Sequence, residues 1–234
     1  MFVDLETTGL AGGAGTYAFL VGCAWFEPFG PSARGGRTSD AVFRVRQFFL
    51  SDFGAEPLLL GALARAAADA GALVTYNGKT FDVPLIDTRF VLHRMPTPFG
   101  SLPHVDMLHA ARRLWRAPEE EGASCRLSVL ERSVCGHVRE GDVPGFEIPA
   151  RYFHYVRTGD ARPLAGVFEH NRLDLLSLAV LTASAAQLLE QGADAAGTAR
   201  EAYGLGRLYE RAGLSLDARR AYARAIDLRG DHAA

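Results

Sequence analysis

The chain has 234 residues, of which 48% are hydrophobic, and this is enough for one good core with room for a small appendage. A net charge of -2 and a pI of about 6.4 exclude the strongly basic composition of many nucleic-acid-binding domains, although a local cationic groove or a bound metal would serve instead. Three widely spaced cysteines without a C-x-x-C pair indicate neither a disulfide framework nor a zinc site, and they favour a cytoplasmic location.

Membrane and export signals are missing from the sequence pattern. No uninterrupted apolar stretch reaches about 18 residues, and the N-terminus has neither a basic region nor a cleavage site of the signal-peptide type. We therefore expect no membrane span and no membrane partner. The first expected strand begins almost at Met1, which is typical of a fragment that lacks its preceding residues.

The N-terminal region predicts three strands in succession, joined by glycine-rich loops, over residues 1–6, 17–26 and 41–50. Their order and short connections favour an antiparallel meander. Asp4 and Glu6 lie close to the end of the first strand, and they point to the same face because side chains alternate along a strand. Paired carboxylates of this kind bind divalent cations, and a polar strand end in solvent is the alternative.

The next region alternates between helix and strand. Helices are expected over residues 57–70, 80–94 and 107–115, with short strands over 72–76 and around 105. Asn77 and Gly78 form the turn after a strand, and Asp82 falls in the first turn of the following helix, where the helix dipole favours an acid even without a function. Asp106 ends the last short strand, and we expect it to cap a helix or to support a metal site.

Helices alone follow, over residues 127–135, 149–157 and 164–189. The last of them carries His170 and Asp174, which share one face because they are four residues apart. Flanking leucines make this helix largely buried, and a buried Asp needs a partner or a metal. With Asp4, Glu6 and Asp82, these residues have the chemistry of a two-metal phosphoryl-transfer site, while a hydrogen-bonded core histidine is the alternative for His170 alone.

The C-terminal residues 199–228 predict two helices with a turn near Gly213. Their small and aromatic residues are placed as in a tetratricopeptide helix pair, and an ordinary amphipathic hairpin is the alternative. A single pair cannot bury its apolar face alone, so it would dock on the core, continue in a longer chain or bind a protein partner.

The pattern of elements predicts an α/β fold: a mixed β-sheet, antiparallel in its first three strands, flanked by helices and followed by a helical hairpin. The expected domains are residues 1–190 and residues 198–230, with a boundary in the glycine-containing stretch 191–197.

The acid-bearing motifs of the sequence together resemble those of a known group. The three motifs are similar to those of the DEDD 3′→5′ exonucleases, which have a ribonuclease H-like fold: Asp4-x-Glu6-Thr7-Thr8-Gly9, Asn77-x-x-x-Phe81-Asp82 and His170-x-x-x-Asp174. A closer similarity to the YprB-like branch rests on four stretches: 77–82 (NGKTFD), 124–128 (SCRLS), 142–145 (DVPG) and 170–171 (HN). The resemblance spans roughly residues 1–190. Members of that branch often carry tetratricopeptide helices after the catalytic domain.

The resemblance implies a 3′→5′ exonuclease that acts on a single-stranded 3′ end of nucleic acid with two Mg²⁺ or Mn²⁺ ions. The expected metal ligands are Asp4, Glu6, Asp82 and Asp174, with His170 as the base that takes a proton from water. The expected substrate-binding residues are Thr7, Thr8, Gly9, Leu10, Asn77, Lys79 and Arg126. Turn residues in solvent are the alternative for Asn77 and Lys79.

One spacing departs from the family pattern. Histidine-type members place His five residues before the last Asp, and tyrosine-type members place Tyr four before it, whereas His170 precedes Asp174 by four. One helical position is a rotation of about 100°, so His170 would either take the proton or only orient the water. Two alternative functions stay open: an inactive nuclease fold that binds nucleic-acid ends, and a scaffold that recruits a protein through the C-terminal helices.

Overall fold

The computed structural model describes residues 1–9, 13–28, 41–116 and 125–230. The chain forms two compact units. The first comprises Met1–Asp106 and Glu140–Leu176, and the second comprises Met107–Arg139 and Ser177–Ala234. The domain limits expected from the sequence, 1–190 and 198–230, divide the chain differently and stay a prediction.

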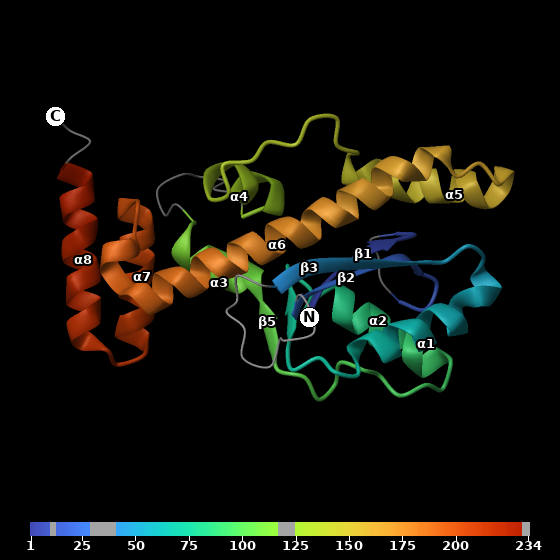
Figure 1. Cartoon of the computed structure of the whole chain (residues 1–234), viewed down its shortest axis with the longest axis horizontal. Helices are drawn as coiled ribbons and strands as arrows, with labels where there is room; N and C mark the ends of the chain where they lie inside the picture. Colours follow the sequence, from blue (N-terminus) through green and yellow to red (C-terminus); the bar gives the residue numbers. More distant parts are fainter. Residues whose placement is uncertain (10–12, 29–40, 117–124, 231–234) are drawn as a thin grey trace. The chain divides into compact units, whose positions relative to one another are not determined.

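The first unit is built on a mixed five-stranded sheet (Figure 1). Its strands are β1 (Phe2–Thr7), β2 (Ala18–Pro28), β3 (Ala41–Phe49), β4 (Leu73–Thr75) and β5 (His104–Asp106), in the order β3-β2-β1-β4-β5. Strands β1, β2 and β3 pair antiparallel, whereas β4 pairs parallel with both β1 and β5. The sheet expected from the sequence is confirmed, and β1 lies at its centre.

The helices follow the predicted order closely. They are α1 (Glu56–Ala67), α2 (Asp82–Leu92), α3 (Met107–Leu114), α4 (Leu127–Ser133), α5 (Ile148–Thr158), α6 (Ala165–Gln191), α7 (Ala199–Arg211) and α8 (Ser215–Gly230). Short 3-10 turns occupy Phe53–Ala55, Gly145–Glu147, Arg162–Leu164 and Gly192–Ala195. Helix α6 begins in the first unit and ends in the second.

The core of the first unit forms where the sheet meets its helices. The first seven residues of β2 are buried, as the continuous apolar run predicts for a central strand. Phe19 of β2 stacks on Tyr152 of α5 with ring centroids 4.1 Å apart, and the Tyr152 hydroxyl donates to the carbonyl of Leu50 at 3.0 Å. A buried hydroxyl with a partner avoids the cost of an unsatisfied polar group, so Tyr152 fixes α5 to the sheet.

The second unit is helical in its described residues. A capping box formed by Thr198 and Glu201 begins α7, and a left-handed Gly213 separates it from α8. Trp115, which follows α3, donates its indole N–H to Glu201 at 3.1 Å and accepts from Arg200 through its carbonyl at 3.3 Å. The hairpin therefore docks on α3, one of the three outcomes that the sequence left open. Its relationship to tetratricopeptide repeats stays a prediction.

One described segment bears on the expectation of no membrane span. Residues Arg162–Ala195 form a helical stretch long and apolar enough to cross a membrane, with a mean hydropathy of 1.4. The core helices of soluble proteins pass the same test, and α6 buries Leu175, Leu178 and Leu181. Length and composition therefore do not distinguish α6 from a buried core helix, and the lack of a membrane partner stays a prediction.

Candidate active site

Strand β1 presents the first pair of acids. Asp4 and Glu6 are two residues apart and therefore share a face, as the period of a strand requires; Asp4 is half-buried and Glu6 is 9% exposed. The register shifts between Glu6 and Thr7, where the strand ends. Because β1 is the central strand, both carboxylates lie in the middle of the sheet rather than at its solvent-exposed edge.

The loop between β4 and α2 brings in Asp82. Asn77 adopts the left-handed conformation with φ 63°, which asparagine tolerates, and Gly78 follows because a Cβ there would come 2.5 Å from Thr75 Cβ. The carboxylate of Asp106 accepts from the backbone N–H groups of Asn77 at 2.8 Å and Lys79 at 3.0 Å. Asp106 therefore fixes the turn that leads into α2, where Asp82 is the first residue.

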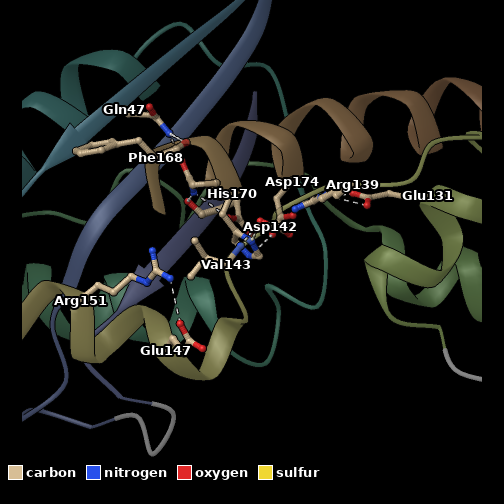
Figure 2. A network of polar contacts seen from close by, with 12 residues as sticks. Gln47, Glu131, Arg139, Asp142, Val143, Glu147, Arg151, Phe168, His170 and Asp174 are labelled. Carbon is tan, nitrogen blue, oxygen red and sulfur yellow. Dashed lines mark hydrogen bonds and ion pairs between the residues drawn. The ribbon is translucent and has the colours of Figure 1, made fainter. Parts of the chain in front are cut away.

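Helix α6 supplies the histidine and the fourth acid. His170 Nε2 lies 3.6 Å from Asp174 Oδ2, which confirms that the two residues share a face. His170 Nδ1 lies 2.8 Å from Asp142 Oδ1, and the same oxygen accepts from the backbone N–H of Val143. Figure 2 shows the side chains of Asp142, His170 and Asp174 together. Asp142 fixes the orientation of the ring and leaves Nε2 directed toward Asp174.

Electrostatics places the four predicted acids in one neighbourhood. Burial raises the pKa of Asp4 well above its usual value, and the charges of Asp174, Glu6 and Asp82 raise it further, while a hydrogen bond from Asn171 opposes them. Burial, then Asp106 and Asp174, raise the pKa of Asp82 to about 7. Acids from β1, α2 and α6 therefore interact, although they are far apart in the sequence.

The four acids form a donor set suited to a divalent cation. All four side chains offer carboxylate oxygens, the ligands that Mg²⁺ and Mn²⁺ prefer, and the charges that act on Asp4 are all negative. Over the described residues, no group of three or more His, Cys, Asp or Glu side chains is already arranged to hold a metal ion. Like charges repel, so such ligands would close only around a cation. By its chemistry the donor set suits divalent cations, and the number of ions stays a prediction.

The residues predicted to hold the terminal nucleotide follow β1 directly. Thr7 Oγ1 donates to the carbonyl of Gly9 at 2.9 Å, and Thr8 Oγ1 accepts from the backbone N–H of Tyr17 at 2.9 Å. Both hydroxyls therefore shape the turn after the strand. Leu10 lies outside the described residues. A role for these positions in substrate binding stays a prediction.

The other predicted substrate contacts lie in different places. Asn77 Oδ1 accepts from Thr80 at 2.9 Å, so its side chain helps to close the turn, whereas Lys79 is exposed beside it. Arg126 is the N-cap residue of α4 in the second unit, and it is exposed. Contact with phosphate stays a prediction for all three.

Sequence reasoning assigned no role to several residues that the structure places beside the acids. Asn171 is fully buried and donates to Asp4 Oδ2 at 2.8 Å, although in the sequence it is recognisable only as part of a family motif. Asp142 is likewise recognisable only as part of the family motif at residues 142–145. Gln47 and Gly22 carried no signal, because their contacts with α6 join segments more than 120 residues apart. The one clue in the sequence to this support of the site is Asn171, an amide residue next to His170 on a helix that is expected to be largely buried.

The family of the chain is shown by comparison with known proteins. The chain belongs to the RNase_H superfamily, whose family model matches residues 1–186. The chain is therefore an α/β protein, and its membership of this superfamily supports a nuclease-type function.

A relative gives a finer comparison. The chain is 38% identical over 181 residues to a Bacillus subtilis (strain 168) protein named "Uncharacterized protein YprB". This match covers 76% of the chain and 39% of the relative. The similarity to YprB that the motifs indicated is thus confirmed, and the DEDD exonuclease assignment stays a prediction.

Proposed function

We propose that the chain is a metal-dependent exonuclease that removes nucleotides from the 3′ end of a nucleic acid. The observation that carries the proposal is that Glu6, Asp82 and Asp174, from three different elements, lie near enough to Asp4 for their negative charges to raise its pKa. A cluster of this kind is costly in a protein without a cation. Membership of the RNase_H superfamily supports nuclease chemistry at such a cluster.

Asp4, Glu6, Asp82 and Asp174 would hold two Mg²⁺ or Mn²⁺ ions. When bound, such ions lower the pKa of a water molecule and neutralise charge on the leaving 3′ oxygen. The chain's own residues bring the remaining chemistry, which is the removal of a proton from the attacking water and the placement of the terminal nucleotide.

His170 is suited to take that proton at Nε2. A general base is effective when a second group orients it, and Asp142 does so by its 2.8 Å contact with Nδ1. The ring then presents Nε2 on the side of Asp174. This arrangement supports a base role at the four-residue spacing, because Asp142 directs the ring toward the acid cluster.

The substrate would lie across the end of β1. Thr7, Thr8, Gly9 and Leu10 follow the two strand acids directly, so they are placed to hold the terminal nucleotide. Lys79 is exposed on the turn that leads to Asp82, and its charge is suited to a phosphate. Asn77 and Arg126 are further candidates for phosphate contact.

A substrate panel tests the proposal. Single- and double-stranded DNA and RNA, each with a free or blocked 3′ or 5′ end, would be incubated with the chain in Mg²⁺, Mn²⁺ or a chelator. We expect stepwise shortening from free 3′ ends of single strands, dependent on the metal. Asp4→Ala and Asp174→Ala are expected to abolish it, while the exposed substitution Arg172→Gln leaves it unchanged.

Three outcomes would contradict the proposal. The first is a wild-type chain that removes no nucleotide in Mg²⁺ or Mn²⁺, and the second is degradation that starts at free 5′ ends. The third is a rate close to wild type in Asp4→Ala or Asp174→Ala, which would remove these residues from the metal site.

A further inference from the structure

A row of three residues crosses the sheet beneath α6. In the strand register Asp4 of β1 faces Gly22 of β2, and Gly22 faces Gln47 of β3. A Cβ on Gly22 would come 2.9 Å from Asn171 Cγ and 2.8 Å from Leu175 Cδ1, closer than real Cβ atoms approach. Glycine at this position therefore lets α6 lie close enough for Asn171 to reach the strands on both sides.

The orientation of the Gln47 amide is set by a backbone group. Its Nε2 atom donates to the carbonyl of Phe168 at 2.7 Å and to Asn171 Oδ1 at 2.9 Å. Figure 2 shows Gln47 beside Phe168. A carbonyl oxygen only accepts, so the Gln47 atom that meets Phe168 must be the nitrogen. Because this nitrogen also donates to Asn171, the Asn171 atom that faces Gln47 must be the amide oxygen.

A second backbone group fixes the other end. Asn171 Nδ2 donates to the backbone carbonyl of Asp4 at 3.2 Å and to Asp4 Oδ2 at 2.8 Å. Again the carbonyl accepts only, so the nitrogen must face Asp4. Asn171 is fully buried, so water does not replace either bond. The two amides therefore have one orientation, in which Gln47 donates to Asn171 and Asn171 donates to Asp4.

We propose that Gln47 and Asn171 form an amide relay that holds the Asp4 carboxylate in position for a divalent cation. The inference rests on the proposed function, because the cation is the one that the nuclease site would bind. Asn171 fixes the rotation of the carboxylate through Oδ2 and leaves its other oxygen for the ion. Asn171 and Gln47 are positioning residues, and partners of metal ligands in this role change metal affinity by about 10- to 100-fold.

Mn²⁺ binding in the absence of nucleic acid, measured by calorimetry on the full chain, tests the relay. Asn171→Ala removes the donor to Asp4, and Gln47→Met removes the group that orients Asn171, without a change of charge in either variant. We expect Mn²⁺ affinity to fall about 10- to 100-fold in Asn171→Ala and about 10-fold in Gln47→Met. The control Tyr152→Phe loses a different buried hydrogen bond, to Leu50, and we expect its affinity to be unchanged.

The double variant separates a relay from two structural roles. Gln47 acts on Asp4 only through Asn171, so adding Gln47→Met to Asn171→Ala should weaken Mn²⁺ binding no further. Losses that multiply in the double variant would overturn the relay, as would single variants that bind Mn²⁺ within about twofold of wild type. If Asn171→Ala does not fold, Gln47→Met against Tyr152→Phe decides the question alone.

The failure of the relay is distinguishable from that of the proposed function. A wild-type chain that binds Mn²⁺ and degrades 3′ ends, with variants of unchanged affinity, leaves the function standing and removes the relay. A wild-type chain that binds no Mn²⁺ removes both.

Discussion

Two acids in the first unit, the buried Glu56 and the half-buried Asp4, are treated in opposite ways. Glu56 of α1 is 2% exposed, and its oxygens accept from Arg89 Nε at 2.6 Å and from another guanidinium nitrogen at 2.5 Å. His93 Nε2 lies 2.6 Å from the same carboxylate. Asp4 of β1, by contrast, is surrounded by acids, and its described hydrogen-bond partner is the uncharged amide of Asn171.

This difference separates an acid that stabilises the fold, Glu56, from an acid that we propose binds a metal ion, Asp4. Where an acid serves the fold, the chain provides its own cation, and Arg89 also donates to the carbonyl of Ala14 at 2.6 Å and lies over the Tyr17 ring. The charges that raise the pKa of Asp4 are instead those of other acids, Asp174, Glu6 and Asp82, which is expected where a cation comes from solution. Removing charge should therefore damage the fold at Glu56 and relieve it at the acid cluster.

The largest effect on stability is expected at the paired acid. Glu56→Gln leaves Arg89 charged, buried and without its counterion, so we expect the free energy of unfolding to fall by about 3–5 kcal/mol in urea denaturation. The control Glu169→Gln breaks an exposed ion pair with Arg172 and should cost less than about 1 kcal/mol. Equal losses of unfolding free energy in Glu56→Gln and Glu169→Gln would show that burial does not make the Glu56 ion pair the more important of the two.

A smaller effect is expected when His170 is substituted, and it falls on the rate of cleavage of the nucleic acid. His170→Ala should lower kcat by about 10²-fold, because the attacking water loses its base, and Asp142→Asn should lower it less, because the ring stays but loses its orienting charge. Both are measured as single-turnover removal of a 3′ nucleotide. A His170→Ala rate close to wild type would show that the four-residue spacing keeps His170 out of the base role.

The smallest effect is expected at Asp82, and it has the opposite sign to that at Glu56. Asp106 and Asp174 act on Asp82 with like charge, so Asp82→Asn should raise the free energy of unfolding of the metal-free chain by about 1 kcal/mol, the equivalent of roughly one pKa unit. Urea denaturation in chelator measures it. A loss of stability in this variant would mean that Asp82 is bound as a structural acid.

The sequence predicted the parts of the fold that local patterns determine. The continuous apolar run of β2, the alternation of β3 and the Asn77-Gly78 turn each follow from near neighbours, and the strands and turn formed as expected. The same reasoning placed Asp4 and Glu6 on one face of a strand, and His170 and Asp174 on one face of a helix. These relationships depend only on the periods of strand and helix.

The support of the site was not predictable in the same way. Gly22 reads as an ordinary glycine inside a strand until α6 is placed over it, and Gln47 reads as one polar residue of an edge strand. Glu56 likewise reads as an acid at a helix start, since its pairing with Arg89 joins two helices. These contacts depend on the register of three strands and the approach of a distant helix, which no local pattern encodes.

Thermal unfolding of wild type and Asp4→Asn, with and without Mn²⁺, tests the central claim most directly. If the acid cluster exists for an external cation, Asp4→Asn should melt at a higher temperature than wild type in chelator, because a like charge is removed. Mn²⁺ at about 100 times its Kd should then stabilise wild type by about 2.7 kcal/mol and the variant much less. An Asp4→Asn chain that is less stable in chelator, or that Mn²⁺ stabilises as much as wild type, would contradict the account.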